Sequence, residues 1–211
     1  MISQPKTIMK TITFPSIFTF LLFSLVLEAA HASSNEQVFD ISGGKLQIGP
    51  TYYVLPSPTT RLSGLALIGD EPCPLYVAAE DAYEGFPVSF NAMSRKQAVV
   101  NISTDVNIQF YIKNMTCPLS SVWKIGEFDA WTKQRFVTIG GVLGKPGKKT
   151  VSIWFKIEKY DDDYYKIVYC PSVCKQCKVQ CSDVGVYLDD YNENKRLALS
   201  NVPLKVQFKQ A

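Results

Sequence analysis

The stretch Val106-Asn107-Ile108-Gln109-Phe110-Tyr111-Ile112 alternates apolar and polar side chains, and this alternation predicts a half-buried β-strand. Short apolar runs on both sides of it end at Gly, Pro or Asp residues, as strands separated by turns do. These runs cover residues 46–55, 65–68, 88–90, 136–139, 151–157, 165–169, 185–188, 197–199 and 203–208. No segment sustains the helical spacing of apolar residues over three turns. The sequence therefore predicts one all-β domain, built as a closed barrel or a sandwich.

The composition agrees with this class. The chain has 211 residues, of which 46% are hydrophobic and 19% charged, so it is expected to fold rather than remain disordered. Its 22 Lys and Arg residues against 19 Asp and Glu residues give a net charge of +3 of mixed sign. That balance provides no basic field of the kind that binds nucleic acid, so no nucleic-acid partner is expected.

The first part of the chain has the organisation of an export signal. Residues 1–10 carry two Lys and no acidic residue, residues 11–27 are almost wholly apolar, and Ala30-His31-Ala32 fits the A-x-A cleavage rule. The alternative is a membrane anchor, but the apolar run is at the lower length limit for a span and contains Pro15. We favour the signal peptide.

Residues 1–32 are therefore interpreted as a cleaved signal peptide and residues 33–211 as the domain. We expect a secreted protein, extracellular or vacuolar, with no membrane association after cleavage. Cleavage also removes His31, the single histidine of the chain. Ser–His and Cys–His nucleophile pairs and His-ligated zinc then become impossible, although chemistry with paired carboxylates does not. We expect the protein not to be an enzyme and to need no cofactor.

Six cysteines follow the leader, and an even number in an exported chain predicts three disulfides. Six cysteines allow 15 pairings, which the sequence alone does not resolve. A redox pair or a four-thiolate zinc site in the C-terminal group is the alternative, but both suit the cytosol better than an oxidising export route. We therefore expect disulfides and no metal. The cysteines are Cys73, Cys117, Cys170, Cys174, Cys177 and Cys181.

Two motifs near the start of the domain resemble the N-terminal signature of the plant Kunitz (soybean trypsin inhibitor) family. They are Val38-Phe39-Asp40-Ile41-Ser42-Gly43-Gly44-Lys45-Leu46 and Tyr52-Tyr53-Val54-Leu55-Pro56. The resemblance continues in order through residues 138–142, 154–157, 165–171, 183–187 and 196–200. Because Cys174 and Cys177 lie between Cys170 and Cys181, the chain looks most similar to the miraculin-like branch.

The resemblance implies a β-trefoil of twelve strands with a three-fold pseudo-repeat. It also implies three disulfides, Cys73–Cys117, Cys170–Cys181 and Cys174–Cys177. The taste-modifying member of the branch uses a cysteine to link two chains, but the matching position here is Asp161, so a monomer is expected.

The family relationship also implies a function, that of a secreted protease inhibitor. Its inhibitors present one extended, preorganised loop to the enzyme as a slowly cut substrate. That loop corresponds to residues 91–98 here, and its central residues are Met93, Ser94, Arg95, Lys96 and Gln97. Since a trypsin-type pocket binds a long cation, we expect a trypsin-like serine protease as partner, with Arg95 or Lys96 in the pocket. The sequence leaves a cysteine protease open as the target.

One position departs from the family's inhibitors. Where they place an Asn that hydrogen-bonds the loop backbone, this chain has Ile48, which cannot form that bond. The loop is also longer than in the family's strong trypsin inhibitors. Both features support an alternative, a miraculin-like defence or binding protein with weak or no inhibition.

Two N-x-S/T motifs predict glycosylation at Asn101 and Asn114. Asn101 lies just past the loop, so a glycan there would crowd the face that meets a protease.

Overall fold

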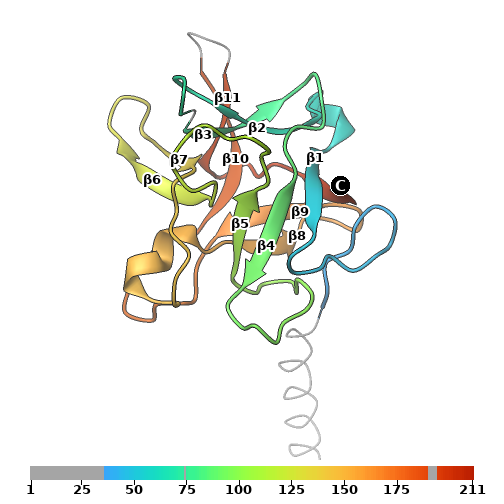
Figure 1. Cartoon of the computed structure of the whole chain (residues 1–211). Helices are drawn as coiled ribbons and strands as arrows, with labels where there is room; N and C mark the ends of the chain where they lie inside the picture. Colours follow the sequence, from blue (N-terminus) through green and yellow to red (C-terminus); the bar gives the residue numbers. More distant parts are fainter. Residues whose placement is uncertain (1–35, 74, 190–193) are drawn as a thin grey trace, which may run out of the picture. The chain divides into compact units, whose positions relative to one another are not determined.

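The computed structural model describes residues 36–211 apart from residue 74 and residues 190–193, so the expected signal peptide lies outside the described residues (Figure 1). None of the helices in the described part is long and apolar enough to cross a membrane. Twelve strands are present there: β1 (Thr51–Pro56), β2 (Gly64–Ile68), β3 (Tyr76–Glu80), β4 (Val88–Ala92), β5 (Val106–Phe110), β6 (Lys124–Asp129), β7 (Gln134–Thr138), β8 (Lys156–Lys159), β9 (Tyr165–Tyr169), β10 (Ser182–Leu188), β11 (Lys195–Ser200) and β12 (Val206–Gln210). Two 3₁₀ helices accompany them, η1 (Pro58–Thr60) and η2 (Lys148–Ile153).

Six strands form an antiparallel barrel. β1 pairs with β12 and β4, β4 with β5, β8 with β9, and β9 with β12. The remaining gap between β5 and β8 is closed by two backbone bonds, from the Val106 N–H to the Phe155 carbonyl at 2.8 Å and from the Phe155 N–H to the Val106 carbonyl at 2.9 Å. The ring of strands thus has no open edge.

Three hairpins, β2–β3, β6–β7 and β10–β11, complete the fold. Their inner strands pair with one another, since β3 contacts both β7 and β11, and β7 also contacts β11. The pairs are Tyr76 with Thr138, Arg196 with Ala78, and Ala198 with Phe136. Each third of the chain therefore contributes two barrel strands and one hairpin, which confirms the predicted twelve-strand β-trefoil with a three-fold pseudo-repeat.

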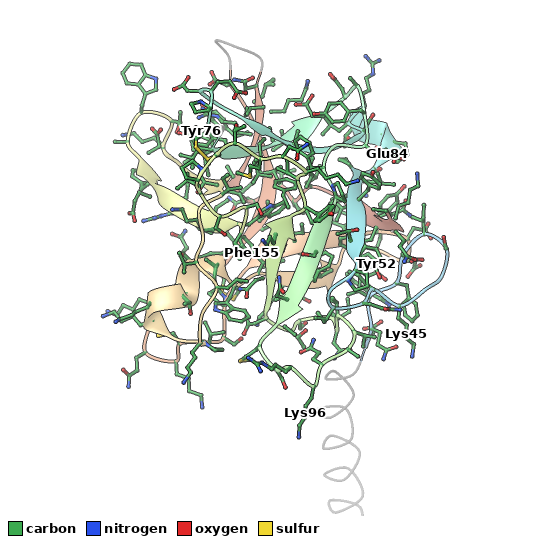
Figure 2. The ribbon with its side chains drawn as sticks, viewed as in Figure 1. Lys45, Tyr52, Tyr76, Glu84, Lys96 and Phe155 are labelled. Atoms are coloured by element: carbon green, nitrogen blue, oxygen red, sulfur yellow. A yellow bond between two sulfur atoms is a disulfide. The ribbon has the colours of Figure 1, made fainter. Side chains whose placement is uncertain are left out.

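Aromatic side chains fill the barrel. Phe90 packs edge-on against Phe208 at a centroid distance of 5.7 Å, and Trp123 packs edge-on against Phe155 at 6.2 Å. All four side chains are fully buried. Burying a side chain of this size contributes about 1.5–3 kcal/mol, so these rings supply much of the energy that fixes the barrel. Figure 2 shows Phe155 and Tyr52 in the body of the barrel.

The cysteines pair as the family resemblance implies: Cys73 with Cys117, Cys170 with Cys181, and Cys174 with Cys177. The first bridge links the first and second repeats, while the other two lie within the third. No cysteine in the described part is free, so no thiolate there is available to a metal.

Within the run predicted as a strand at residues 151–157, the prediction was wrong at residues 151–154. Residues 151–153 belong to η2, and the strand β8 begins only at Lys156. Thr150 explains the difference, because its hydroxyl donates to the Lys145 carbonyl at 2.9 Å and accepts from the Trp154 indole N–H at 3.3 Å, which closes a turn. Ile153 and Trp154 are still buried, so the apolar residues of this segment enter the core without forming a strand. The strands β3 and β6 were not predicted.

Candidate functional site

The loop expected to meet a protease follows strand β4 and projects beyond the barrel. Met93, Ser94, Arg95 and Lys96 are exposed, and Gln97 is half-buried. Figure 2 shows Lys96 at the loop tip with its side chain directed away from the barrel. No ion pair holds Arg95 or Lys96 to another described residue. Both cations are therefore exposed and unpaired within the described part of the chain.

The tip of the loop is a tight turn. The Gln97 N–H donates to the Ser94 carbonyl at 3.1 Å, and the Lys96 N–H donates to the Ser94 hydroxyl at 3.3 Å. Arg95 and Lys96 therefore occupy the two central positions of a β-turn. The extended loop expected from the family resemblance is thus not what the structure has at this position.

The base of the loop, in contrast, is firmly bonded to the N-terminal segment of the domain. The Ile48 N–H donates to the Ala98 carbonyl at 2.9 Å, and the Val100 N–H donates to the Leu46 carbonyl at 2.8 Å. On the loop itself, the Gln97 side-chain amide donates to the Val99 carbonyl at 3.0 Å. Sequence reasoning had not identified this backbone ladder. It fixes where the loop leaves the barrel while leaving residues 93–96 unsupported.

Ile48 lies beside the loop, as its position in the sequence suggested. Its main chain holds Ala98, but its side chain packs against the apolar core. Within the described part of the chain, no side chain from outside the loop donates a hydrogen bond to the backbone of residues 93–97. The amide nitrogen of Asn91, at the end of β4, is also buried without a hydrogen-bond partner. Among the described residues, the tip therefore lacks the side-chain hydrogen bond that the family resemblance implies for inhibitors.

A buried acid lies immediately before β5, beyond the end of the loop. Asp105 is 4% exposed, and both of its carboxylate oxygens lie 3.1 Å from the Ser172 backbone N–H. The Lys156 ammonium donates to the Ser172 hydroxyl at 2.7 Å. Burial raises the pKa of the Asp105 carboxyl, while the Ser172 N–H and the Lys156 charge oppose part of that rise. Asp105 thereby links the start of β5 to the segment that carries the C-terminal disulfides.

The two glycosylation motifs occupy different surroundings. Asn101 is half-buried and forms an isolated bridge with Gln37, and its carbonyl accepts the Thr104 hydroxyl at 2.8 Å. Asn114 is exposed on the segment after β5, with a left-handed backbone at φ 60°. Asn114 is thus the more accessible of the two, and glycosylation at both stays a prediction. No cluster of three metal-binding side chains occurs among residues 36–211 outside the gaps at 74 and 190–193.

Comparison with known proteins points to one family. A legume Kunitz family model, described as "Trypsin and protease inhibitor", matches residues 38–210. Kunitz trypsin inhibitor 5 of Arabidopsis thaliana is 42% identical over 202 residues, covering 92% of this chain and 97% of the relative. Miraculin of Synsepalum dulcificum is 39% identical over 216 residues, covering 95% and 97%.

Solved structures agree on the fold. A Kunitz-type cysteine protease inhibitor from potato superposes with a TM-score of 0.75 at 33% identity, covering 84% of this chain and 98% of the other. Soybean trypsin inhibitor, in its complex with porcine pancreatic trypsin, superposes with a TM-score of 0.66 at 27% identity, covering 83% and 99%.

Proposed function

The chain belongs to the Kunitz family of plant trypsin and protease inhibitors, whose members are inhibitors rather than enzymes, and from this premise we propose that it inhibits a trypsin-like serine protease through residues 91–98. The observation that carries the proposal is the exposure of Arg95 and Lys96 at the tip of a projecting loop, without ion-pair partners among the described residues. One of these two cations fills the carboxylate-lined specificity pocket of the enzyme. The soybean relative in its trypsin complex supports this class of partner.

The proposal is tested by titrating trypsin with the purified protein and with two single variants, Arg95→Gln and Lys96→Gln. The variant that removes the pocket residue should weaken inhibition by at least about 30-fold, because anchor residues at interfaces contribute about 2 kcal/mol or more. Lys149→Gln is the matched control, since it removes one exposed Lys outside the loop and should leave inhibition unchanged. If both loop variants inhibit as well as the parent protein, the loop is not the contact.

Papain should be titrated in parallel, because the potato relative is named as a cysteine protease inhibitor. Inhibition of papain in the absence of any effect on trypsin would replace the serine protease in the proposal by a cysteine protease. The same loop variants would then show whether residues 91–98 or another surface makes that contact.

A second candidate function is that of a miraculin-like defence or binding protein with weak or no inhibition. The observations that favour it are the Ser94–Gln97 turn and the absence of side-chain support at Ile48. An unsupported tip loses more conformational entropy when it docks and is cut more readily. Ile48→Asn should therefore strengthen inhibition and slow cleavage of the loop. Ile48→Val is its matched control, because it keeps an apolar side chain without a donor.

We further propose that residues 1–32 form a signal peptide that is removed on secretion and that the secreted domain is a glycoprotein. N-terminal sequencing of protein purified from its native source should begin at residue 33. Intact mass before and after enzymatic deglycosylation should change if Asn101 or Asn114 carries a glycan. A retained leader would contradict the secretion proposal.

A further inference from the structure

One side of the domain carries a groove that the proposed inhibitory function does not use. Its central cleft has a volume of about 510 Å³ and lies against the β6–β7 hairpin. A second cleft of about 380 Å³ shares Arg135, Gln180 and Leu199 with it, and a third of about 320 Å³ shares Ser182, Ser200 and Asn201. Because they share lining residues, the three clefts adjoin one another, and we refer to them together as the groove. No residue of 91–98 lines any of the three.

The central cleft is rich in free hydrogen-bonding groups. The side-chain amides of Gln134, Gln180 and Asn201 line it, and none of the three is hydrogen-bonded to another described residue. Each amide offers both donors and an acceptor, which is the combination that recognises a hydroxyl group. Phe128 adds an apolar surface and is 51% exposed. Amides beside an exposed aromatic ring suit a sugar, whose rim is polar and whose face is apolar.

The charge of the central cleft is positive. Lys133 and Arg135 line it and no carboxylate does. Arg135 lies opposite Phe128 in the hairpin register and donates to the Gly126 carbonyl at 3.2 Å through one guanidinium nitrogen. The other guanidinium nitrogens of Arg135 have no hydrogen-bond partner among the described residues and can bind a carboxylate in a forked geometry.

Among the residues that line the groove, acidic side chains occur only in the two adjoining clefts. Glu127 lines the second cleft, and in the third cleft Asp183 is paired with the Lys166 ammonium at 2.9 Å. An anionic ligand in the central cleft therefore meets net attraction from Lys133 and Arg135.

We propose that this groove binds an anionic oligosaccharide, namely a chain of uronic acids. In this arrangement Arg135 and Lys133 pair with the sugar carboxylates, the free amides bind hydroxyl groups, and Phe128 packs against a ring face. A groove of adjoining clefts suits an extended polymer better than a single small molecule, and each cleft falls within the range of about 300–1,000 Å³ that is usual for ligand sites.

Calorimetric titration with three probes tests the proposal: a tetramer of galacturonic acid, the same tetramer fully methyl-esterified, and tetraglutamate. The acid tetramer should bind, and the ester should bind at least about tenfold more weakly because it lacks the charge-assisted hydrogen bonds. Equal binding of acid and ester would show that Lys133 and Arg135 do not pair with the sugar carboxylates, which would contradict the proposal. Stronger binding of tetraglutamate would make the occupant an acidic peptide, and absence of binding by the acid tetramer would overturn the proposal.

Variants locate the site. The pair Lys133→Gln and Arg135→Gln should weaken binding of the acid tetramer by at least about tenfold. The control pair, Lys145→Gln and Lys149→Gln, removes the same charge outside the groove and should have little effect. Phe128→Ala should weaken the acid and the ester alike, since ring packing does not depend on charge. If both double variants weakened binding of the acid tetramer equally, the effect would be one of overall charge, and the proposed site would be wrong.

Discussion

Because Asp105 is buried, its carboxyl group should make the free energy of unfolding fall as pH rises. Acids whose pKa is lowered by folding have the opposite effect. Burial raises the folded-state pKa of Asp105 above its unfolded value of about 3.9. Between these two pKa values the folded protein holds more protons at this site than the unfolded chain does. The contribution of Asp105 to the free energy of unfolding therefore falls as pH rises through this window, and it is fully present below it.

Asp105→Asn isolates this contribution. The Asn side chain keeps an oxygen that can accept the Ser172 N–H but does not titrate. At the acid end, a neutral amide replaces a neutral acid, so the variant should be about as stable as the parent protein. As pH rises, the parent loses up to about 1.4 kcal/mol per pH unit relative to the variant, which is the limit for a single proton. Above the folded pKa of Asp105 the difference should be constant.

The assay is urea denaturation of both proteins, with disulfides intact, at steps from about pH 3 to pH 8. Asp129→Asn serves as a control of opposite sign. The N–H groups of Thr132 and Trp131 bind the Asp129 carboxylate and lower its pKa, so the parent gains stability through Asp129 as pH rises. If the Asp105→Asn difference has the same sign as the Asp129→Asn difference, the hydrogen bond and the Lys156 charge outweigh burial and our reasoning is wrong.

Three further variants test the fold. Phe155→Ala should lower the free energy of unfolding by about 3–5 kcal/mol in urea denaturation, because the ring is fully buried where β5 meets β8, and a loss below 1 kcal/mol would contradict that packing. Removing the Cys73–Cys117 bridge by a double Ser substitution should cost about 4 kcal/mol on the loop-closure model, since it spans 44 residues, and an unchanged thermal midpoint would refute this. Gly64→Ala should abolish soluble expression or cost several kcal/mol, because the new methyl would lie 1.9 Å from the Glu84 carbonyl oxygen, and a stable variant would show that the chain can shift there.

The alternation of residues 106–112 correctly located the strand β5 at residues 106–110, but not its burial. Asn107 is buried together with its apolar neighbours, and its side-chain amide donates to the Ile153 carbonyl at 2.9 Å, so the strand is not half-buried as the alternation predicted. The trefoil itself came from the family resemblance, because its three-fold closure depends on contacts distant in sequence. Tyr76 pairs with Thr138, and Arg196 pairs with Ala78, and no short-range pattern encodes such partners. Local patterns therefore indicated the class, and the resemblance indicated the topology.

The two missed strands have weak propensity of their own. β3 contains two adjacent alanines, and β6 contains Gly126 and three charged residues, all of which are uncommon in strands. β6 also changes register between Ile125 and Phe128, which breaks its alternation. Both are strands because their partners, β2 and β7, supply the pairing. The groove beside β6 was equally invisible, since its walls come from four separate segments.

The loop location was predicted, but its turn was not, although Ser94 carried the signal. A Ser at the first turn position accepts a backbone N–H two residues on, as Ser94 does from Lys96. Breaking the Ser94–Gln97 bond on docking costs only about 0.5–1.5 kcal/mol. Fixing the backbone of a fully flexible residue costs about 1–2 kcal/mol, and the turn already orders residues 94–97 in part. We therefore expect a donor side chain at position 48 to lower the remaining cost of ordering the tip, which the proposed Ile48→Asn variant tests.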